Sequence, residues 1–443
     1  MKRLALCLAA AAAVLSPVLV PQIASAQNRG GPVTLVRAGN LFDSETGRMV
    51  GPRDLLIQRG RITEVGQGLT APEGTTVVDL SRCSVLPGLI DAHTHLLLEQ
   101  GFEEGLADVA ARDNAILGDA YRSLRSAPHA KAYLHAGFTA VRDLGNAGRF
   151  LDVILSRAIR DGHIEGPRMY VSGPPLSSQG GQIEHVAGDP HHLVDSEYRV
   201  VRGVEDARQA VREAIAGGAN VIKVYAEATP QRTRLSVEEL TAVVAEAKRH
   251  GLTVAAHATS DAGTRDAVMA GVTSIEHGYA ASDATLRLMA QKGVWLVPTD
   301  ASQALFTEFA SHDPANAPPP EAIAAQLERQ RDRLRRARAA GVKIAAGSDG
   351  YYPVNGGRGV GSRHLLDAYV ESGMTPAQAL QSATVEAAAV IGDARLGALK
   401  AGNYADLIAM PGDPTTGLAA LKDLKLVMQN GRIPVSDNGA CGG

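Results

Sequence analysis

Tryptophan and cysteine are the scarcest residues of this 443-residue sequence, which has one Trp and three Cys. No two cysteines form a CxxC or another metal-binding spacing, which excludes thiolate zinc sites such as zinc fingers. An excess of basic charge is also missing, because 44 Lys and Arg face 47 Asp and Glu. The sequence therefore lacks the clustered positive face that nucleic-acid binding requires, and we expect no nucleic-acid partner.

A long apolar run is found only at the amino terminus, where residues 1–26 have the pattern of a signal peptide. Lys2 and Arg3 precede an apolar stretch from Leu4 to Val20, and Ala24-Ser25-Ala26 supplies a small-residue cleavage site. Prolines interrupt this stretch, and it falls short of the roughly 18 or more residues of a spanning helix. We expect cleavage after Ala26, a periplasmic or secreted protein, and no membrane association afterwards. An uncleaved anchor is the alternative.

Two cysteines, Cys83 and Cys441, remain after this cleavage. In an oxidising compartment they could form a disulfide, since both lie in the segments assigned below to a small β domain. The sequence favours the simpler alternative of one buried thiol and one loose thiol in the tail.

The remaining sequence changes character twice. Residues 27–86 and 389–443 alternate short strands with Gly- and Pro-rich turns, which predicts one small β-sandwich built from both termini. Between them, residues 87–388 alternate apolar strands with helix-period segments, as βα units do. The eight predicted strands are Leu89–His95, Phe138–Asp143, Arg168–Ser172, Asn220–Ala226, Leu252–His257, Thr273–His277, Val294–Pro298 and Val342–Asp349. The fold class is therefore α/β, a (β/α)8 TIM barrel. The Arg- and Glu-rich helix at 321–340 is expected to be a solvated outer face.

Polar side chains of metal-binding type lie at the ends of five of these strands. They are His93, His95, Lys223, His257, His277 and Asp349. His93 and His95 are two residues apart on a strand, so that their rings point to one side. Taken singly, each residue has a plain structural explanation, and Lys223 could extend its ammonium group out of its apolar strand.

The spacing of these residues makes the combination specific. The separation from Lys223 to His257 is 34 residues, from His257 to His277 is 20, and from His277 to Asp349 is 72. One βα unit of a TIM barrel takes roughly 30 residues, and active sites lie at the carboxyl ends of the strands. The sequence thus predicts that all six side chains share one rim.

This set resembles the binuclear, carboxylated-lysine form of the amidohydrolase superfamily. The phrases PGLIDAHTHL, GFTAVRDLG, NVIKVYAEA, SIEHG and AAGSDG carry the resemblance, as does LGALKAGNYADLIAMPGDP near the end. Within the superfamily the sequence is most similar to the imidazolonepropionase-related branch, which contains Xaa-Pro and Xaa-Arg dipeptidases and ochratoxin-type amidohydrolases. Members of this kind often form homo-oligomers, so the resemblance implies one here.

The resemblance also implies residue roles. His93, His95 and Asp349 would hold a first metal ion, His257 and His277 a second, and Lys223, as a carbamate formed with CO2, would bridge them. Imidazole and carboxylate ligands suit zinc best, with manganese or cobalt also possible. A bridging hydroxide would attack an amide or peptide bond of a dipeptide or N-acyl amino acid, with Asp349 as general base and Lys223 and His277 completing the catalytic set.

The substrate contacts are less specific. The candidates are Tyr225, His185, Arg142, Arg363 and Tyr351, of which the arginines could bind a substrate carboxylate. The branch often carries a GGH motif, whereas this sequence has Gly180-Gly181-Gln182, and His185 could replace the missing histidine. Two alternatives stay open: a lactonase, phosphotriesterase or cyclic-amide hydrolase on the same site, and an exported binding protein that has lost catalysis.

Overall fold

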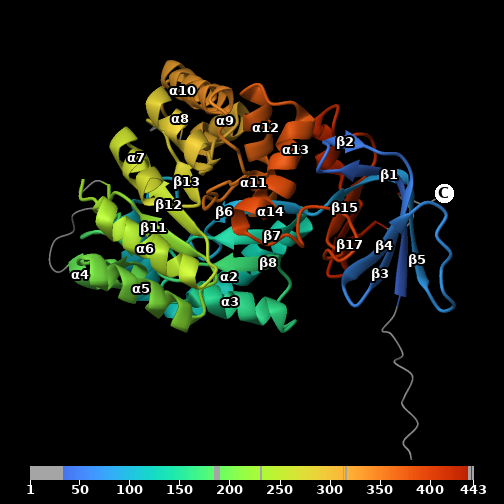
Figure 1. Cartoon of the computed structure of the whole chain (residues 1–443), viewed down its shortest axis with the longest axis horizontal. Coiled ribbons are helices and arrows are strands. Elements are labelled where there is room, and N and C mark those ends of the chain that lie inside the picture. Colours follow the sequence, from blue (N-terminus) through green and yellow to red (C-terminus); the bar gives the residue numbers. More distant parts are fainter. Residues whose placement is uncertain are drawn as a thin grey trace, which may run out of the picture.

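A barrel of alternating strands and helices forms the larger part of the computed structural model, and a sheet from both ends of the chain lies beside it (Figure 1). The structure describes residues 33–183, 190–229, 232–312, 314, 317–437 and 441. The predicted signal peptide at 1–26 and His185 lie outside these residues.

The barrel strands follow the prediction closely. Their bounds are β6 (Leu89–Thr94), β7 (Phe138–Asp143), β8 (Arg168–Val171), β11 (Ile222–Tyr225), β12 (Val254–Ala258), β13 (Ser274–His277) and β14 (Trp295–Val297), with the short β9 (Leu176–Ser177) and β10 (Arg199–Val200) added. Strands β6, β7 and β8 form one parallel sheet, and β11 to β14 belong to a second. The backbone of Val221 donates to Val171 and so links the two sheets.

The predicted eighth strand, Val342–Asp349, pairs only through isolated bridges at Ile344 and Gly350. Its backbone is nevertheless hydrogen-bonded on both sides. Ala345 donates to Leu296 on one side, and Asp349 donates to the carbonyl of His93 in β6 on the other, at 2.8 Å. This segment therefore occupies the place of the eighth strand and joins β14 to β6.

Helices cover the outside of the barrel. They are α1 (Leu106–Ala111), a π-helix (Arg112–Leu117), α2 (Gly118–His135), α3 (Leu151–Arg160), α4 (Pro190–Glu197), α5 (Val204–Gly217), α6 (Val237–Arg249), α7 (Asp261–Ala270), α8 (Asp283–Lys292), α9 (Gln303–His312), α10 (Pro320–Ala339), α11 (Arg358–Ser362), α12 (His364–Glu371), α13 (Pro376–Ser382) and α14 (Val385–Ile391). Capping residues explain where some of these helices begin. At the start of α6, the Ser236 hydroxyl accepts a hydrogen bond from the backbone N–H of Glu239, and the Glu239 carboxylate accepts one from the backbone N–H of Ser236. No helix in the described part of the chain is both long and apolar enough to cross a bilayer.

The second unit is an eight-stranded sheet made from both termini. It contains β1 (Val33–Asp43), β2 (Arg48–Met49), β3 (Arg53–Gln58), β4 (Arg61–Gly66), β5 (Thr76–Pro87), β15 (Leu407–Met410), β16 (Leu426–Gln429) and β17 (Arg432–Ser436). Strand β5 pairs in parallel with β1 on one side and antiparallel with β15 on the other, so the late strands β17-β16-β15 continue the early strands β5-β1-β3-β4 in one hydrogen-bonded order. In Figure 1 the blue and red ends of the chain meet here. The predicted boundary at residue 388 falls within α14, which continues to Ile391.

A two-residue turn closes the last hairpin of this sheet. Asn430 and Gly431 connect β16 to β17 with φ angles of 50° and 73°. Positive φ at both central positions is the requirement of a type I′ turn, which Asn-Gly meets at low cost.

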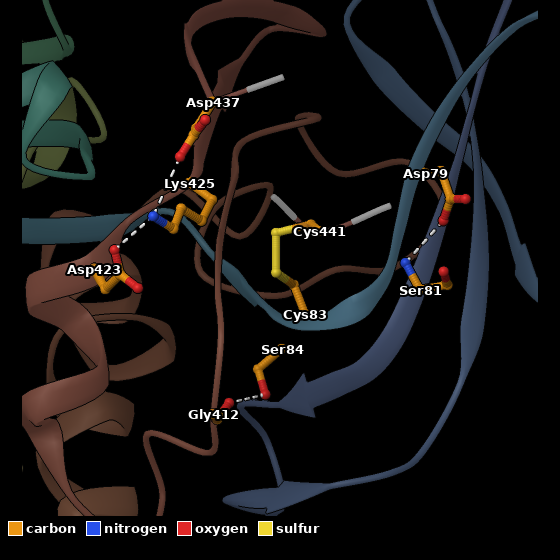
Figure 2. The surroundings of a disulfide bond; sticks show 9 residues. All are labelled: Asp79, Ser81, Cys83, Ser84, Gly412, Asp423, Lys425, Asp437 and Cys441. Carbon is orange, nitrogen blue, oxygen red and sulfur yellow. Dashed lines mark hydrogen bonds and ion pairs between the residues drawn. A yellow bond between two sulfur atoms is a disulfide. The ribbon is translucent and has the colours of Figure 1, made fainter. Parts of the chain in front are cut away.

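A disulfide joins Cys83 in β5 to Cys441 in the tail (Figure 2). Their Cα atoms are 5.2 Å apart, and both side chains are buried. The backbone of Arg82 also donates to the carbonyl of Cys441, at 2.9 Å. The preference for two unpaired thiols was therefore wrong, because the return of the chain through β15 to β17 brings the tail back onto β5.

Candidate metal centre

A small cavity of about 180 Å³ opens at the carboxyl end of the barrel strands. Its walls combine four imidazoles, one carboxylate, three phenols, two carboxamides and two leucines. The lining residues are His93, His95, Leu98, Leu106, Asn146, Gln182, Tyr225, His257, His277, Tyr279, Asp349 and Tyr351. Five of the six predicted metal ligands thus meet in one place, and the sixth, Lys223, lies on the adjacent β11.

His93 and His95 on and just after β6 share a face with Asp349. The Nε2 atoms of His93 and His95 lie 3.6 Å and 3.1 Å from Oδ1 of Asp349. The ligand atoms of these three residues all lie within 4.8 Å of one another, a spacing that suits one divalent ion.

His257 and His277 come from the neighbouring strands β12 and β13. Their ring centroids are 4.7 Å apart, and the ring of His277 is 5.2 Å from that of His93. His277 has φ 72° and Asp349 has φ 52°, in the left-handed region that residues other than glycine rarely adopt. This backbone conformation interrupts strand alternation, so that His277 turns into the cavity although Glu276 before it also faces the barrel interior. Such strain is characteristic of functional sites.

Lys223 is the least expected member of the group. Its side chain is 1% exposed, and its Nζ has no hydrogen-bond partner among the described residues. Burial lowers the pKa of Lys223 to about 8, against an ordinary value of 10.5. A buried amine with a lowered pKa, close to His93, His257 and His277, is a fitting precursor for an anionic ligand.

Hydrogen bonds fix the protonation of the rings. Nδ1 of His93 lies 2.8 Å from the Glu276 carboxylate, and Nδ1 of His95 lies 2.7 Å from the carbonyl of Gly145. Both acceptors require Nδ1–H, which leaves the Nε2 lone pair free on each ring.

The other two rings are held in the same protonation state. Thr299 donates its hydroxyl proton to Pro298, so it accepts from Nδ1 of His277 at 2.8 Å. The amide nitrogen of Gln182 donates to Nε2 of His257, also at 2.8 Å, so the lone pair of this ring is on Nε2 but accepts a hydrogen bond that a metal ion would have to replace.

The pKa values favour the deprotonated ligand set. Burial lowers the pKa of His257 to about 3, and burial together with neighbouring basic groups takes the pKa values of His93 and His277 well below 6.5. Burial would raise the pKa of Asp349, but His93, His95 and Lys223 outweigh it and lower that pKa. Neutral imidazoles and an ionised carboxylate are the forms that bind divalent metals.

The predicted substrate contacts divide into two groups. Tyr225 and Tyr351 line the cavity: the Tyr225 ring lies 4.6 Å from that of His257, and Tyr351 lies 6.0 Å from His95. Arg142 does not reach the cavity, because it is completely buried in the barrel interior and is paired with Glu276. Arg363 donates instead to the carbonyl of Leu421.

Three residues that the sequence analysis did not assign to the site contact the ligands. Glu276 holds His93, Gln182 holds His257, and Arg333 of α10 donates to the carbonyls of His277 and Pro298. Arg333 is 1% exposed, so the expectation that helix 321–340 is only a solvated face was wrong at this position. Gln182 occupies the position of the family histidine in the GGH motif, which was the available signal.

Comparison with known proteins agrees with this geometry. The sequence matches the Amidohydrolase family over residues 84–433. It is 30% identical to ochratoxinase of Aspergillus niger over 423 residues, covering 89% of this chain and 84% of that protein. It is 26% identical to imidazolonepropionase of Deinococcus deserti over 386 residues, covering 80% and 84%. A crystal structure of an Xaa-Pro dipeptidase with methionine in the active site superposes with a TM-score of 0.76 at 28% identity, over 90% of this chain and 99% of that one.

Proposed function

This chain belongs to the amidohydrolase family, and we propose that it hydrolyses the amide bond of an N-acyl amino acid or a dipeptide at a centre of two divalent metal ions. The observation that carries the proposal is the convergence of four imidazoles, one carboxylate and a buried lysine whose Nζ has no hydrogen-bond partner among the described residues. The similarity to ochratoxinase and to an Xaa-Pro dipeptidase supports the substrate class.

The residues divide into two ligand groups. His93, His95 and Asp349 would hold one ion, and His257 and His277 would hold the other. The neutral Nζ of Lys223 would add to CO2, forming a carbamate with release of one proton, and this anion would complete both ligand groups. Zinc suits this mixture of imidazole and oxygen ligands best.

Two such ions, when bound, polarise the scissile carbonyl and lower the pKa of water. The residues of the chain do the rest. Asp349 is ionised and reaches the ligand cluster, so it can accept the proton of the attacking water at its carboxylate. It can then give this proton to the leaving nitrogen.

The substrate would be held by neutral groups of the cavity wall. The Tyr225 hydroxyl donates to the side-chain oxygen of Asn146 at 3.3 Å, and Gln182 lies beside His257. These groups can hydrogen-bond the carboxylate of an amino-acid leaving group. Tyr351, across the cavity beside His95, offers an aromatic face to the acyl side.

Metal analysis combined with a substrate panel tests the proposal. Wild-type protein should contain about two metal ions per chain and should cleave N-acyl-phenylalanine or an Xaa-Pro dipeptide. Lys223→Ala should lose metal and amide cleavage together. Lys343→Ala, which removes an exposed lysine on the same barrel's eighth segment, is the matched control and should behave as wild type.

The opposite results are equally clear. One ion or none in the wild type, with cleavage indifferent to Lys223→Ala, would contradict the two-metal centre. Hydrolysis of a lactone or phosphotriester, with no cleavage of any amide in the panel, would show that the protein acts on one of the alternative substrate classes. Incorporation of ¹³C from labelled bicarbonate into wild type, and its absence in Lys223→Ala, would identify the carbamate.

We also propose that the protein is exported and cleaved after Ala26. The Cys83–Cys441 disulfide supports this, because disulfides persist in oxidising compartments. Amino-terminal sequencing of the purified protein should start at Gln27. A chain that retains residue 1 in the cytoplasm would contradict export.

A further inference from the structure

A buried ion pair lies directly beneath the ligand cluster. One oxygen of Glu276 is 2.8 Å from Nδ1 of His93, and the other is 2.9 Å from Nη2 of Arg142. All three side chains are at most 1% exposed. The guanidinium of Arg142 and the carboxylate of Glu276 are thus enclosed in the barrel, next to the ring of His93.

His93 differs in this respect from the other histidines of the cluster. A backbone carbonyl holds His95, and a threonine hydroxyl holds His277. Among the described contacts, His93 is the one ring of the cluster whose Nδ1 is hydrogen-bonded to a carboxylate. A carboxylate on Nδ1–H fixes the ring tautomer and makes Nε2 a more basic ligand, as in the carboxylate–histidine–metal arrangement.

Arg142 contacts this carboxylate and also binds the groups on either side of it. Its Nε donates to the carbonyl of Ala92, next to His93, at 2.6 Å, and its Nη1 donates to Ser274 at 3.2 Å. Ser274 in turn donates to Glu276 at 2.5 Å. Strands β6, β7 and β13 are therefore tied together behind His93, and the charge of Glu276 is compensated where no water reaches it.

We propose that Glu276 and Arg142 are positioning residues of the metal centre. Glu276 holds His93 with Nε2 directed at the first ion and strengthens the binding of that ion, and Arg142 keeps the Glu276 carboxylate aimed at the ring. Arg142 thus serves His93 and not a substrate carboxylate. This inference rests on the proposed two-metal centre, but it concerns residues that bind neither ion nor substrate.

The test compares Glu276→Gln with Glu246→Gln. Glu246 on α6 is also a largely buried carboxylate paired with arginines, Arg212 and Arg249, but it lies outside the cluster. Affinity for Zn²⁺ is measured by competition with a chelating dye, and the tautomer of His93 in metal-free protein is read from ¹⁵N shifts of its ring. Glu276→Gln should bind one of two ions 10- to 100-fold more weakly and should change the His93 ring signals. Glu246→Gln should change neither.

Arg142→Met extends the test to the second residue. It should weaken the same ion, whereas a substrate-binding role would raise KM and leave Zn²⁺ affinity unchanged, which would overturn the inference for Arg142. If Glu276→Gln fails to fold, Glu276→Asp replaces it, because the charge stays while the carboxylate withdraws from His93. Its Zn²⁺ affinity should fall by a similar factor.

The outcomes separate the two proposals. Absence of stoichiometric metal from the wild type contradicts the two-metal centre itself. Two ions in the wild type, with unchanged Zn²⁺ affinity and unchanged His93 signals in the Glu276 variant, overturn the positioning role alone.

Discussion

The ligand cluster of the barrel and the sheet built from both termini are stabilised in opposite ways. Both collect residues from distant parts of the sequence: the cluster uses positions 93 to 349, and the sheet joins 33–87 to 407–436. The sheet has its own apolar core, which includes Val36, Leu55 and Leu407, together with a disulfide. The cluster instead encloses Lys223, whose Nζ has no hydrogen-bond partner in the described part of the chain, and two residues in left-handed conformations. If the proposed metal ions bind there, they would supply part of the stability of this rim, whereas the sheet has an apolar core and a disulfide of its own.

Replacing Asp349 by Asn should have the largest effect. The variant cannot accept a proton at that position, so kcat/KM for an amide substrate should fall by roughly 10³-fold, within the range for general acid–base groups. Steady-state kinetics with metal content measured in parallel checks this. Asp152→Asn, a buried carboxylate on α3 away from the cavity, is the control. Activity within tenfold of wild type would contradict the role of Asp349.

Removing metal should destabilise the rim and spare the sheet. Ions present at about a thousand times their Kd stabilise the folded state by roughly 4 kcal/mol, and chelation removes this amount. Hydrogen exchange should then accelerate around β6, β12 and β13 more than in β1 and β5. Equal acceleration of exchange in both regions would contradict the expected difference between rim and sheet. Recovery of the slow exchange when Zn²⁺ is added back is the control.

Removing the disulfide should do the reverse. Cys83→Ser should lower the free energy of unfolding by about 2–4 kcal/mol, the usual contribution of such a cross-link. Metal content and activity at 25 °C should stay unchanged, because the sulfur atoms lie in the sheet and not at the rim. Thermal unfolding with and without reductant measures this, since the variant should no longer respond to reductant. Loss of activity in the folded variant would show that the two regions are coupled.

The smallest effect concerns pH and the junction of the two regions. Asp393, just after α14, accepts hydrogen bonds from Arg395 and from Tyr170 of β8. Burial raises the pKa of Asp393, but these bonds outweigh it and lower the pKa to about 2, against 3.8 ordinarily. A carboxyl with a lowered folded-state pKa stabilises the protein fully above about pH 4 and loses this contribution as pH falls to 2.

Asp393→Asn should therefore remove part of the acid sensitivity between pH 4 and 2. The contribution is about 1 kcal/mol, because solvent screens the pair. Denaturant unfolding of wild type and variant at pH 6 and pH 3 gives the value. A difference between them that grows as pH falls would contradict the sign.

The sequence predicted the barrel and the clustering of the candidate ligands at its rim because both follow local rules. Each apolar strand, and each residue of metal-binding type at its end, can be recognised from the sequence of that segment alone. Strand β7, for example, has its predicted bounds of Phe138–Asp143. Pairing across the barrel is not visible in this way. Arg142 ends a strand like the ligands do, but its orientation towards Glu276 depends on β13, which is 132 or more residues away.

The errors have the same origin. Cys83 and Cys441 are 358 residues apart, and no spacing rule connects them. The sequence around Arg333 is that of a charged, exposed helix, but its side chain is buried and donates a hydrogen bond to the backbone carbonyl of His277. Both contacts arise from the three-dimensional course of the chain, which the residue pattern of either segment does not contain.

The pairing of β5 with β15 in the terminal sheet has a consequence for biosynthesis. Strand β5 is among the first parts made, but its partner β15 and the second cysteine come after all six proposed metal ligands. A polypeptide terminated between Asp349 and Leu407 would carry the complete ligand set and expose an unpaired edge of β5. Only translation to residue 441 therefore supplies both the strand that covers this edge of β5 and the cysteine that pairs with Cys83.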